Sequence, residues 1–167
     1  FGVGVVDNHY IDEYGIKAAN KEAMRRALVE LLRKVQKDYE IEGVLIDGND
    51  GYTFEELRKK PIFLVGGDGK IPEIGAASII AKVFRDKLML QYATLYPEFG
   101  FAKNAGYGTK KHQNTLQTPQ DITGIHRLSY KPIKEVLEKK EKVLVHICCG
   151  PDATVPLMDL KQEYEVI

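Results

Sequence analysis

The sequence predicts a layered α/β domain, because two kinds of segment alternate along it. Short apolar runs end in turns rich in glycine and aspartate, and the longer segments between them repeat apolar residues at helical spacing. Of the 167 residues, 44% are hydrophobic and 29% are charged, a composition that can bury a sizeable core. The formal net charge is zero, so binding to nucleic acid would require a local basic region.

The N-terminal half predicts three strands and one long helix. Phe1–Val6 is an apolar run with two glycines, which is typical of a buried strand. A helix is expected from about Ile16 to Val35, where apolar residues recur three or four positions apart. Gly43–Ile46 and Ile62–Val65 are predicted as short buried strands, and each ends in a glycine-containing turn.

The stretch Gly75–Asp86, GAASIIAKVFRD, lies in a helix predicted from about Ile74 to Leu95. Asp86 is at the border of the apolar stripe of this helix, where a carboxylate on a rigid element suits metal binding or acid–base chemistry. The pattern of this helix, taken alone, favours the interpretation of Asp86 as an ordinary surface aspartate between two basic residues. The stripe, which we expect to be buried, consists of Ala76, Ala77, Ile80, Val83, Phe84 and Leu88.

The C-terminal part predicts further helices and then a change of character. A helix is expected to start near Thr109, after a stretch rich in glycine and aromatic residues. Ile133–Lys142 is strongly charged and is interpreted as a solvated helix or linker. An apolar run, Val143–Ile147, follows it and predicts a new strand. We therefore expect a first domain over residues 1–138, a linker over 139–142 and the start of a second domain over 143–167.

Asp47 and Asp86 are the candidate catalytic carboxylates. Asp47 follows a buried strand, at the end where α/β folds place their ligands, although an aspartate that shapes its own turn is the alternative. Converging carboxylates bind Mg²⁺ or Mn²⁺, and two-ion hydrolysis of phosphodiesters uses more than two of them. These two residues alone are too few to establish such a centre.

A second group of residues has chemistry suited to nucleic acid. Tyr107 lies between two glycines and offers a flat face to a base or sugar. The start of the next helix, with Lys110 and Lys111, suits a phosphate. The alternative is a glycine-rich loop with a packed aromatic ring. The region from Lys82 to His112 is also locally basic, with six lysines and arginines against two acids.

The histidines are interpreted as surface or packing residues. His112, His126 and His146 lack metal-ligand spacing with one another. His126 and Arg127, which are adjacent, are the best suited of this group to contact a phosphate.

The remaining features bear on location and completeness. Cys148 and Cys149 are adjacent, so they rarely pair with each other, and a reducing, cytoplasmic setting is expected. The sequence contains no signal peptide and no apolar run of about 18 residues, so no membrane span is expected. The chain begins without methionine on Phe1–Val6 and ends on the strand-like Tyr164–Ile167, and we interpret both ends as cut from a longer chain.

Residues 1 to about 135 resemble ribonuclease HII in the order and spacing of their motifs. No single stretch is decisive, but the complete order is highly specific. The supporting stretches are Gly2–Val5 with Ile11–Glu13, Met24–Ala27, Leu45–Asn49, Gly67–Asp68 with Lys70, Gly75–Asp86, Tyr96–Pro97, Phe99–Lys103, Gly106–Thr109, and Ile125–Arg127 with Ser129.

The resemblance implies a ribonuclease H-like fold and cleavage of the RNA strand of RNA–DNA hybrids, including single ribonucleotides in duplex DNA. It implies four acidic ligands for two divalent ions, Mg²⁺ or Mn²⁺, and two of these ligands map onto Asp47 and Asp86. The other two belong to an Asp-Glu motif on a strand upstream of Phe1, so we expect a partial fold that lacks this N-terminal strand.

The resemblance also implies substrate contacts. The tyrosine that reads the RNA–DNA junction in this family maps onto Tyr107, and a ribose 2′-hydroxyl is the group that distinguishes RNA from DNA. A Gly-Asp-x-Lys stretch of the family maps onto Gly67 with Asp68 and Lys70. The residues expected to contact backbone phosphates are Lys110, Lys111 and Arg127.

Residues 143–167 resemble the first strand and helix of a second α/β domain, that of the epoxyqueuosine reductases, iron–sulfur enzymes of tRNA modification. The matching ligand candidates are Cys148, Cys149 and Asp152, and cysteine thiolates suit an iron–sulfur cluster. The further cysteines of that family are missing, so a cluster would require a complete second domain. Buried thiols at a strand end are the alternative.

The predicted function is a metal-dependent endoribonuclease of DNA replication and ribonucleotide repair. We expect a cytoplasmic monomer that acts on RNA–DNA hybrids or on duplex DNA containing ribonucleotides. Two alternatives belong to other classes: a fragment of an iron–sulfur tRNA-modification enzyme, and a catalytically incomplete protein that only binds hybrids. A natural fusion, a fragment and a misassembled gene are all compatible with this sequence.

Overall fold

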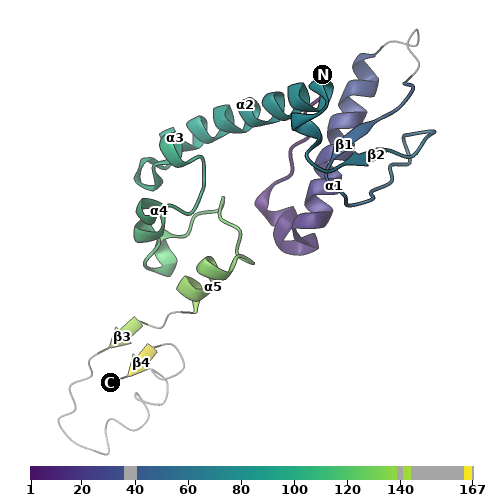
Figure 1. Ribbon diagram of the computed structural model, residues 1–167. Helices are drawn as coiled ribbons and strands as arrows, with labels where there is room; N and C mark the ends of the chain where they lie inside the picture. The colour runs from purple at the N-terminus through teal and green to yellow at the C-terminus, as the bar shows by residue number, and fades with distance from the viewer. Residues whose placement is uncertain (36–40, 139–140, 144–163, 167) are drawn as a thin grey trace, which may run out of the picture.

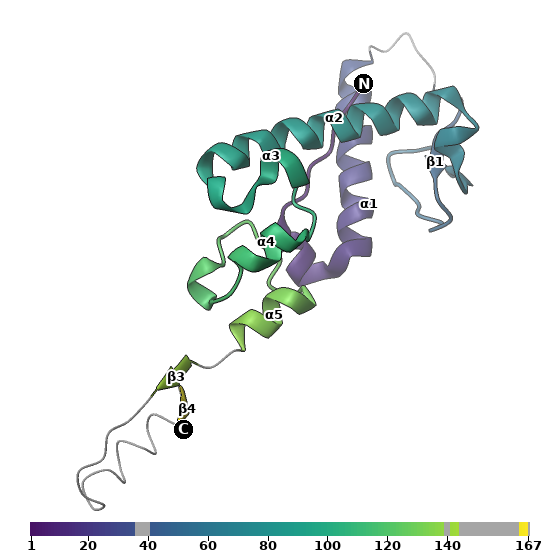
Figure 2. The same cartoon turned by 60° about the vertical axis from the view of Figure 1, so that its left-hand side comes forward.

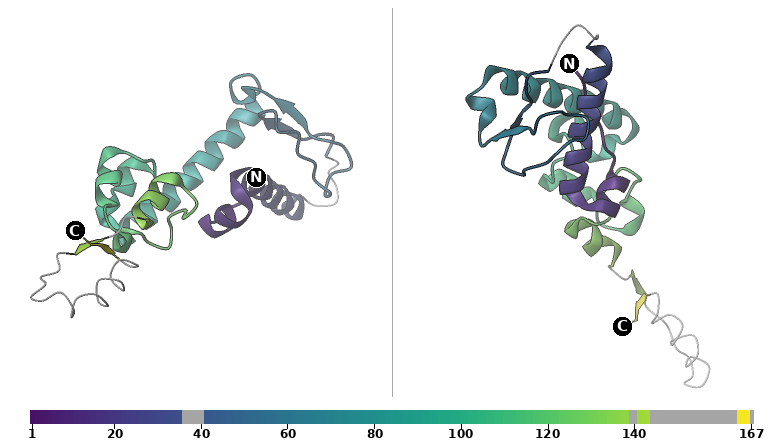
Figure 3. Two further views of the ribbon diagram at one scale, coloured as in Figure 1. Left: turned by 90° about the horizontal axis from the view of Figure 1, so that it is seen from below. Right: turned by 90° about the vertical axis from the view of Figure 1, so that its right-hand side faces the viewer.

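The computed structural model describes residues 1–35, 41–138, 141–143 and 164–166. Figure 1 shows α2 as a long rod, with β1 and β2 near one end and α3, α4 and α5 beyond the other, and the left view of Figure 3 separates the same two groups. The predicted α/β class is confirmed, although helix dominates and the sheets are small and parallel. The elements are α1 (Asn8–Lys34), β1 (Leu45–Asp47), β2 (Ile62–Leu64), η1 (Gly67–Gly69), α2 (Pro72–Leu95), η2 (Pro97–Phe99), α3 (Phe101–Asn104), α4 (Lys110–Thr115), η3 (Pro119–Asp121), α5 (Lys131–Leu137), β3 (Glu141–Val143) and β4 (Tyr164–Val166).

Helix α1 contains the predicted helix and begins earlier, at Asn8. Asp7 caps it by accepting a hydrogen bond from the Tyr10 N–H at 2.9 Å. Gly15, at a φ of 82°, kinks the helix. The kink explains why the apolar repeat used for the prediction starts only after this glycine.

The predicted strand Phe1–Val6 is wrong. These residues pair with no strand in the described part of the chain and lie along α1 instead. Gly2 and Gly4 approach the backbone of α1 so closely that a Cβ at either position would collide with it. The Val3 N–H donates to the Glu30 carboxylate of α1. The helix thus supplies a partner to a backbone group that a neighbouring strand would otherwise bind.

Strands β1 and β2 confirm two of the predicted strands but not their burial, because Leu45 and Ile62 are 40% and 56% exposed. They pair in parallel, with Ile46 opposite Phe63, and Ile46 is buried. One further bond follows the pairing, from the Gly48 N–H to the Leu64 carbonyl at 3.0 Å. Because the strands are parallel, the turns after Asp47 and after Leu64 leave from the same edge of the sheet.

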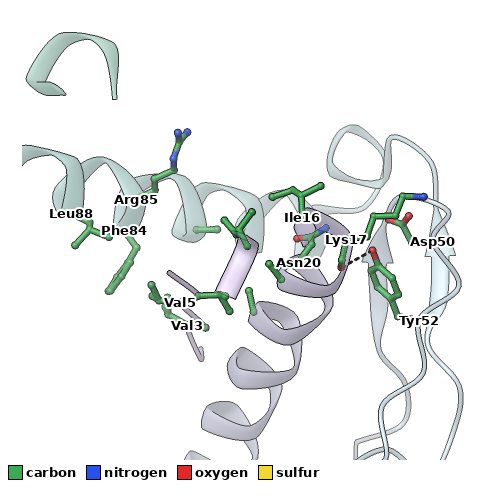
Figure 4. A pocket seen from close by; sticks show the side chains of 16 residues that line it. Val3, Val5, Ile16, Lys17, Asn20, Asp50, Tyr52, Phe84, Arg85 and Leu88 are labelled. Carbon is green, nitrogen blue, oxygen red and sulfur yellow. Dashed lines mark hydrogen bonds between the residues drawn. The ribbon is translucent and has the colours of Figure 1, made fainter. Parts of the chain in front are cut away.

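Helix α2 confirms the predicted helix, but the predicted burial of its apolar stripe is wrong: Ile80 and Leu88 are half-buried, and the other four residues of the stripe are exposed. Val83 and Phe84 are 47% and 44% exposed. Figure 4 shows Phe84 and Leu88 on the side of α2 that faces Val3 across a pocket of about 670 Å³. Residues 3–6 and α1 line the far side of this pocket without filling it, which leaves Phe84 and Leu88 only partly covered.

The core beyond the other end of α2 is aromatic. Phe99 is 1% exposed, and its ring centre lies 5.0–5.5 Å from those of Phe101, His112 and His126. The buried side chain of Asn104 donates to the Phe99 carbonyl at 2.7 Å. Of the two interpretations given to the histidines, packing is therefore confirmed for His112 and His126.

The charged run Ile133–Lys142 is helical only in part. Glu141 and Lys142 do not continue a helix, because Glu141–Val143 pair in parallel with Tyr164–Val166. Figure 2 shows this strand pair away from the helices. The iron–sulfur candidates Cys148, Cys149 and Asp152, with most of the predicted strand Val143–Ile147, lie outside the described residues. None of the described helices combines the length and the apolar character needed to cross a membrane.

Candidate active site

The turn between β2 and α2 is fastened by Asp47. Its Oδ1 atom accepts the Gly67 N–H at 2.8 Å. Gly67 is buried, and a Cβ there would meet the Ile74 Cδ1 atom at 2.7 Å, so a larger residue would displace Ile74. The exposed Asp68 follows, and Lys70 donates from Nζ to a main-chain carbonyl of the same turn at 2.7 Å. The predicted substrate residues Asp68 and Lys70 are thus held together at this end of α2.

Asp86 does not join this turn. It lies roughly 18 Å along α2 from Ile74, at a rise of about 1.5 Å per residue. The structure therefore separates Asp47 from Asp86, because one lies by the start of a straight helix and the other lies past its middle. In the described part of the chain, no three histidine, cysteine, aspartate or glutamate side chains form a group that could hold a metal ion. The two assigned metal ligands stay a prediction, and the expectation that they converge is corrected.

Tyr107 is held from α2 by Arg85. One guanidinium nitrogen of Arg85 donates to the Tyr107 hydroxyl and another donates to the Ala105 carbonyl, both at 3.0 Å. The guanidinium carbon lies 4.7 Å from the Tyr107 ring centre, a cation–π distance. Two successive left-handed residues, Ala105 and Gly106, bend the chain toward the helix. Arg85 precedes Asp86 directly, so one stretch of α2 carries the predicted carboxylate and the anchor of the predicted tyrosine.

The three side chains predicted to contact phosphates are not equally accessible to a ligand. Lys110 and Lys111 are exposed in α4, which Thr109 caps as predicted by accepting the His112 N–H at 3.4 Å. The Arg127 guanidinium instead lies 4.7 Å from the centre of the Tyr130 ring. The two lysines are therefore the freer cations of this set.

Sequence reasoning missed two sets of contacts around Tyr107. Arg85 was considered only as a neighbour of Asp86, and no spacing rule signals a bond between residues 22 positions apart. His112 and His126 form the second set, with their Nε2 atoms 3.3 Å apart in a buried site. They come from different elements, so no periodicity links them.

A third missed feature is the clamp between the start of α1 and the loop after His126. The Asp12 carboxylate accepts the main-chain N–H groups of Leu128 and Ser129 at 2.8 and 2.9 Å. Burial acts to raise the pKa of Asp12, but the hydrogen bonds from Ser129 and Leu128 outweigh it and lower this pKa. Asn8 adds a bond from Nδ2 to the His126 carbonyl at 2.9 Å. The clamp joins segments more than a hundred residues apart.

The free energy of unfolding is expected to fall as the pH drops below about 6.5, the ordinary pKa of histidine. Burial, with the nearby His112, lowers the pKa of His126 in the folded chain, so the unfolded chain binds more protons in this range. The stabilisation is complete above the unfolded pKa and is lost as the pH falls through the folded one. Urea denaturation between pH 8 and pH 5 measures this slope, and His126→Asn should flatten it. An unchanged slope in that variant would contradict the assignment.

The fold and the site define a class of protein: an α/β domain that presents an exposed tyrosine, held by a guanidinium group, beside two exposed lysines. A family model described as Ribonuclease HII matches residues 3–133. The chain therefore belongs to the ribonuclease HII family, as the motif order indicated.

Curated relatives named Ribonuclease HII support this membership. The protein from Listeria innocua is 49% identical over 135 residues, which cover 80% of this chain and 47% of that protein. The protein from Endomicrobium trichonymphae is 43% identical over 142 residues, covering 83% and 62%. The protein from Thermotoga maritima is 43% identical over 136 residues, covering 81% and 52%. The chain thus spans about half the length of the curated relatives it matches. Members of this family depend on divalent metal ions.

Proposed function

We propose that the whole protein is an endoribonuclease that cleaves the RNA strand of RNA–DNA hybrids and single ribonucleotides in duplex DNA, in replication and repair. Family membership supports the reaction class. The observation that carries the proposal to particular residues is the anchoring of the exposed Tyr107 by Arg85. A fixed aromatic hydroxyl at the surface suits recognition of a ribose 2′-hydroxyl, which is both a donor and an acceptor.

The same surface offers cations for the substrate backbone. Lys110 and Lys111 are exposed next to the segment that carries Tyr107. We propose that they contact phosphates, which would make binding weaken as salt concentration rises. Arg127, stacked on Tyr130, supports the neighbouring loop in this proposal and contributes less to phosphate binding.

The described carboxylates do not by themselves fit a two-ion centre, since Asp47 and Asp86 lie apart. We propose that Asp86, exposed and next to Arg85, supplies a ligand for Mg²⁺ or Mn²⁺, two ions in the whole protein. When bound, these ions would supply Lewis-acid chemistry for phosphodiester hydrolysis. Asp47 stays the second proposed metal ligand, and it also accepts the Gly67 N–H of the turn that carries Asp68 and Lys70.

The Tyr107→Phe variant is expected to lower the preference for a ribonucleotide. This preference is the ratio of the dissociation constants of an all-DNA duplex and of the same duplex with one ribonucleotide, measured by fluorescence anisotropy in EDTA. Removing the hydroxyl removes the group proposed to contact the ribose and breaks its bond to Arg85, and the loss of a neutral hydrogen bond to the ribose corresponds to roughly a 2- to 10-fold effect. Tyr130→Phe is the matched control, because this tyrosine also lies under an arginine. An unchanged preference in Tyr107→Phe would sink the assignment.

We further propose that the protein acts as a monomer in the cytoplasm and that a second domain begins near residue 143. The strand Glu141–Val143 takes in the last two residues of the linker predicted at 139–142. The end of the family match at residue 133 supports this boundary. Isolation under anaerobic conditions with iron analysis tests the iron–sulfur alternative for Cys148 and Cys149. Stoichiometric iron bound to this chain would favour that alternative.

A further inference from the structure

We propose that His112 and His126 form a one-directional hydrogen-bond relay of neutral imidazoles that positions the Tyr107 loop, defined as residues 105–109. His112 is then a positioning residue that holds the main chain of Tyr107, and His126 fixes His112 in turn. The relay itself rests only on the geometry below. Its consequence for ribonucleotide recognition rests on the proposed function.

The hydrogen-bond network assigns the proton of His126 to Nε2. The Nδ1 atom lies 3.1 Å from the Thr123 main-chain nitrogen, which can only donate, and 3.0 Å from the Thr123 hydroxyl. The Thr123 carbonyl lies farther, at 3.3 Å, and already accepts the His126 main-chain N–H at 3.0 Å. An Nδ1 atom that accepts these bonds carries no proton, so the neutral ring is protonated at Nε2.

This proton determines the state of His112. The two Nε2 atoms lie 3.3 Å apart, so His126 donates and His112 accepts. His112 therefore carries its own proton on Nδ1, which lies 3.2 Å from the Tyr107 carbonyl. That carbonyl also accepts the Thr109 N–H at 2.8 Å, so each of its two lone pairs accepts one hydrogen bond. The donors thus point one way, from Thr123 through both rings to Tyr107.

The relay has a fixed base and ends at an exposed loop. At its base, Asn8 donates to the His126 carbonyl at 2.9 Å, and Asp12 accepts the Ser129 N–H at 2.9 Å. At its other end, the side chain of Tyr107 is 64% exposed. The relay therefore connects the start of α1 to the residue proposed to read the ribose.

Packing alone would not require these polar contacts. The rings lie among Phe99 and Phe101, where apolar side chains would fill the same space. Every ring nitrogen of the pair has a partner within 3.3 Å, and a second proton on either ring would set two N–H groups against each other. The charged side chains on the surrounding elements are exposed or half-exposed and take no part in the relay. They are Glu98, Lys103, Lys110, Lys111 and Arg127.

The first test is the tautomeric state of both rings in the 167-residue chain. Long-range ¹H–¹⁵N correlation spectra distinguish a protonated ring nitrogen from an unprotonated one. We expect His126 to be protonated at Nε2 alone and His112 at Nδ1 alone at pH 7.5. His9, which is exposed on α1, is the internal reference for an ordinary histidine. The opposite tautomers, or a doubly protonated ring at pH 7.5, would overturn the relay.

The second test uses substitutions of His112 that separate positioning from packing. His112→Asn keeps a short N–H donor for the Tyr107 carbonyl and should retain most of the ribonucleotide preference. His112→Leu fills space without a donor and should lower the preference roughly 2- to 10-fold, the range for a neutral hydrogen bond. His9→Asn is the matched control. Equal preference in the Asn and Leu variants would overturn the positioning role.

The two tests remain separable from the proposed function. If the unmodified chain shows no preference for the ribonucleotide duplex, the proposed function fails, and the ring tautomers still decide the relay. If His112→Leu does not fold, the His126→Asn variant serves instead, because it keeps an acceptor for Thr123 but lacks the Nε2 donor. In that variant the Tyr107 carbonyl ¹³C resonance should move, and a stationary resonance would contradict the relay.

Discussion

The Asp86→Asn variant is expected to lower the rate of metal-dependent cleavage by at least about 100-fold. Changing a residue that only hydrogen-bonds a metal ligand lowers activity by up to about 100-fold, and the loss of a ligand itself should cost at least as much. The amide keeps the size of the side chain and removes the charge that would bind Mg²⁺ or Mn²⁺. Single-turnover cleavage of a duplex with one ribonucleotide measures the effect, in a chain that also carries the upstream Asp-Glu strand implied by the resemblance. Glu135→Gln removes a surface charge on α5 and serves as the control.

Two variants of Asp47 complete this experiment. Asp47→Asn retains an oxygen that can accept the Gly67 N–H, whereas Asp47→Ala leaves that N–H without its partner. If Asp47 acts by fastening the turn, the Asn variant keeps most of the activity and the Ala variant loses it. Equal losses in both would show that the charge of Asp47 is required. Near-normal cleavage by Asp86→Asn would remove Asp86 from the metal site.

The Phe99→Ala variant is expected to lower the free energy of unfolding by about 3–5 kcal/mol, the usual cost of removing a buried phenylalanine ring. Phe99 is 1% exposed and contacts Phe101, His112 and His126, so the cavity would lie at the centre of this core. Chemical denaturation at pH 7.5 measures the loss. The ring also supports the histidine pair, so the tautomers assigned above should become mixed in this variant.

Phe84→Ala is the matched control for this stability measurement. Phe84 is 44% exposed beside the pocket on α2, so its loss should cost at most about 1 kcal/mol, close to the range for surface positions. A cost as large as that of Phe99→Ala would show that the apolar side of α2 is covered in solution. A small cost for Phe99→Ala would contradict the location of the core.

The elements that could be predicted from the sequence are those whose signals are local. The long repeat of α2, the short strands β1 and β2, and the cap of α4 at Thr109 were all predictable, because each depends on neighbours a few residues away. Family membership was predictable for the same reason, since it depends on the order of short motifs. The prediction of a strand at Phe1–Val6 was wrong. The residue types suit a strand, but the segment packs against helix α1 and pairs with no strand among the described residues.

Which of these residues meet became visible in the folded chain alone. Asp47 binds the Gly67 turn at one end of α2, and Asp86 lies far along the same helix, a separation that no residue pattern encodes. Arg85 reaches Tyr107, and His112 reaches His126, across intervals of 22 and 14 residues. Such contacts depend on how helices and loops pack in space: the two histidines meet in a buried core, whereas Arg85 and Tyr107 meet at the surface.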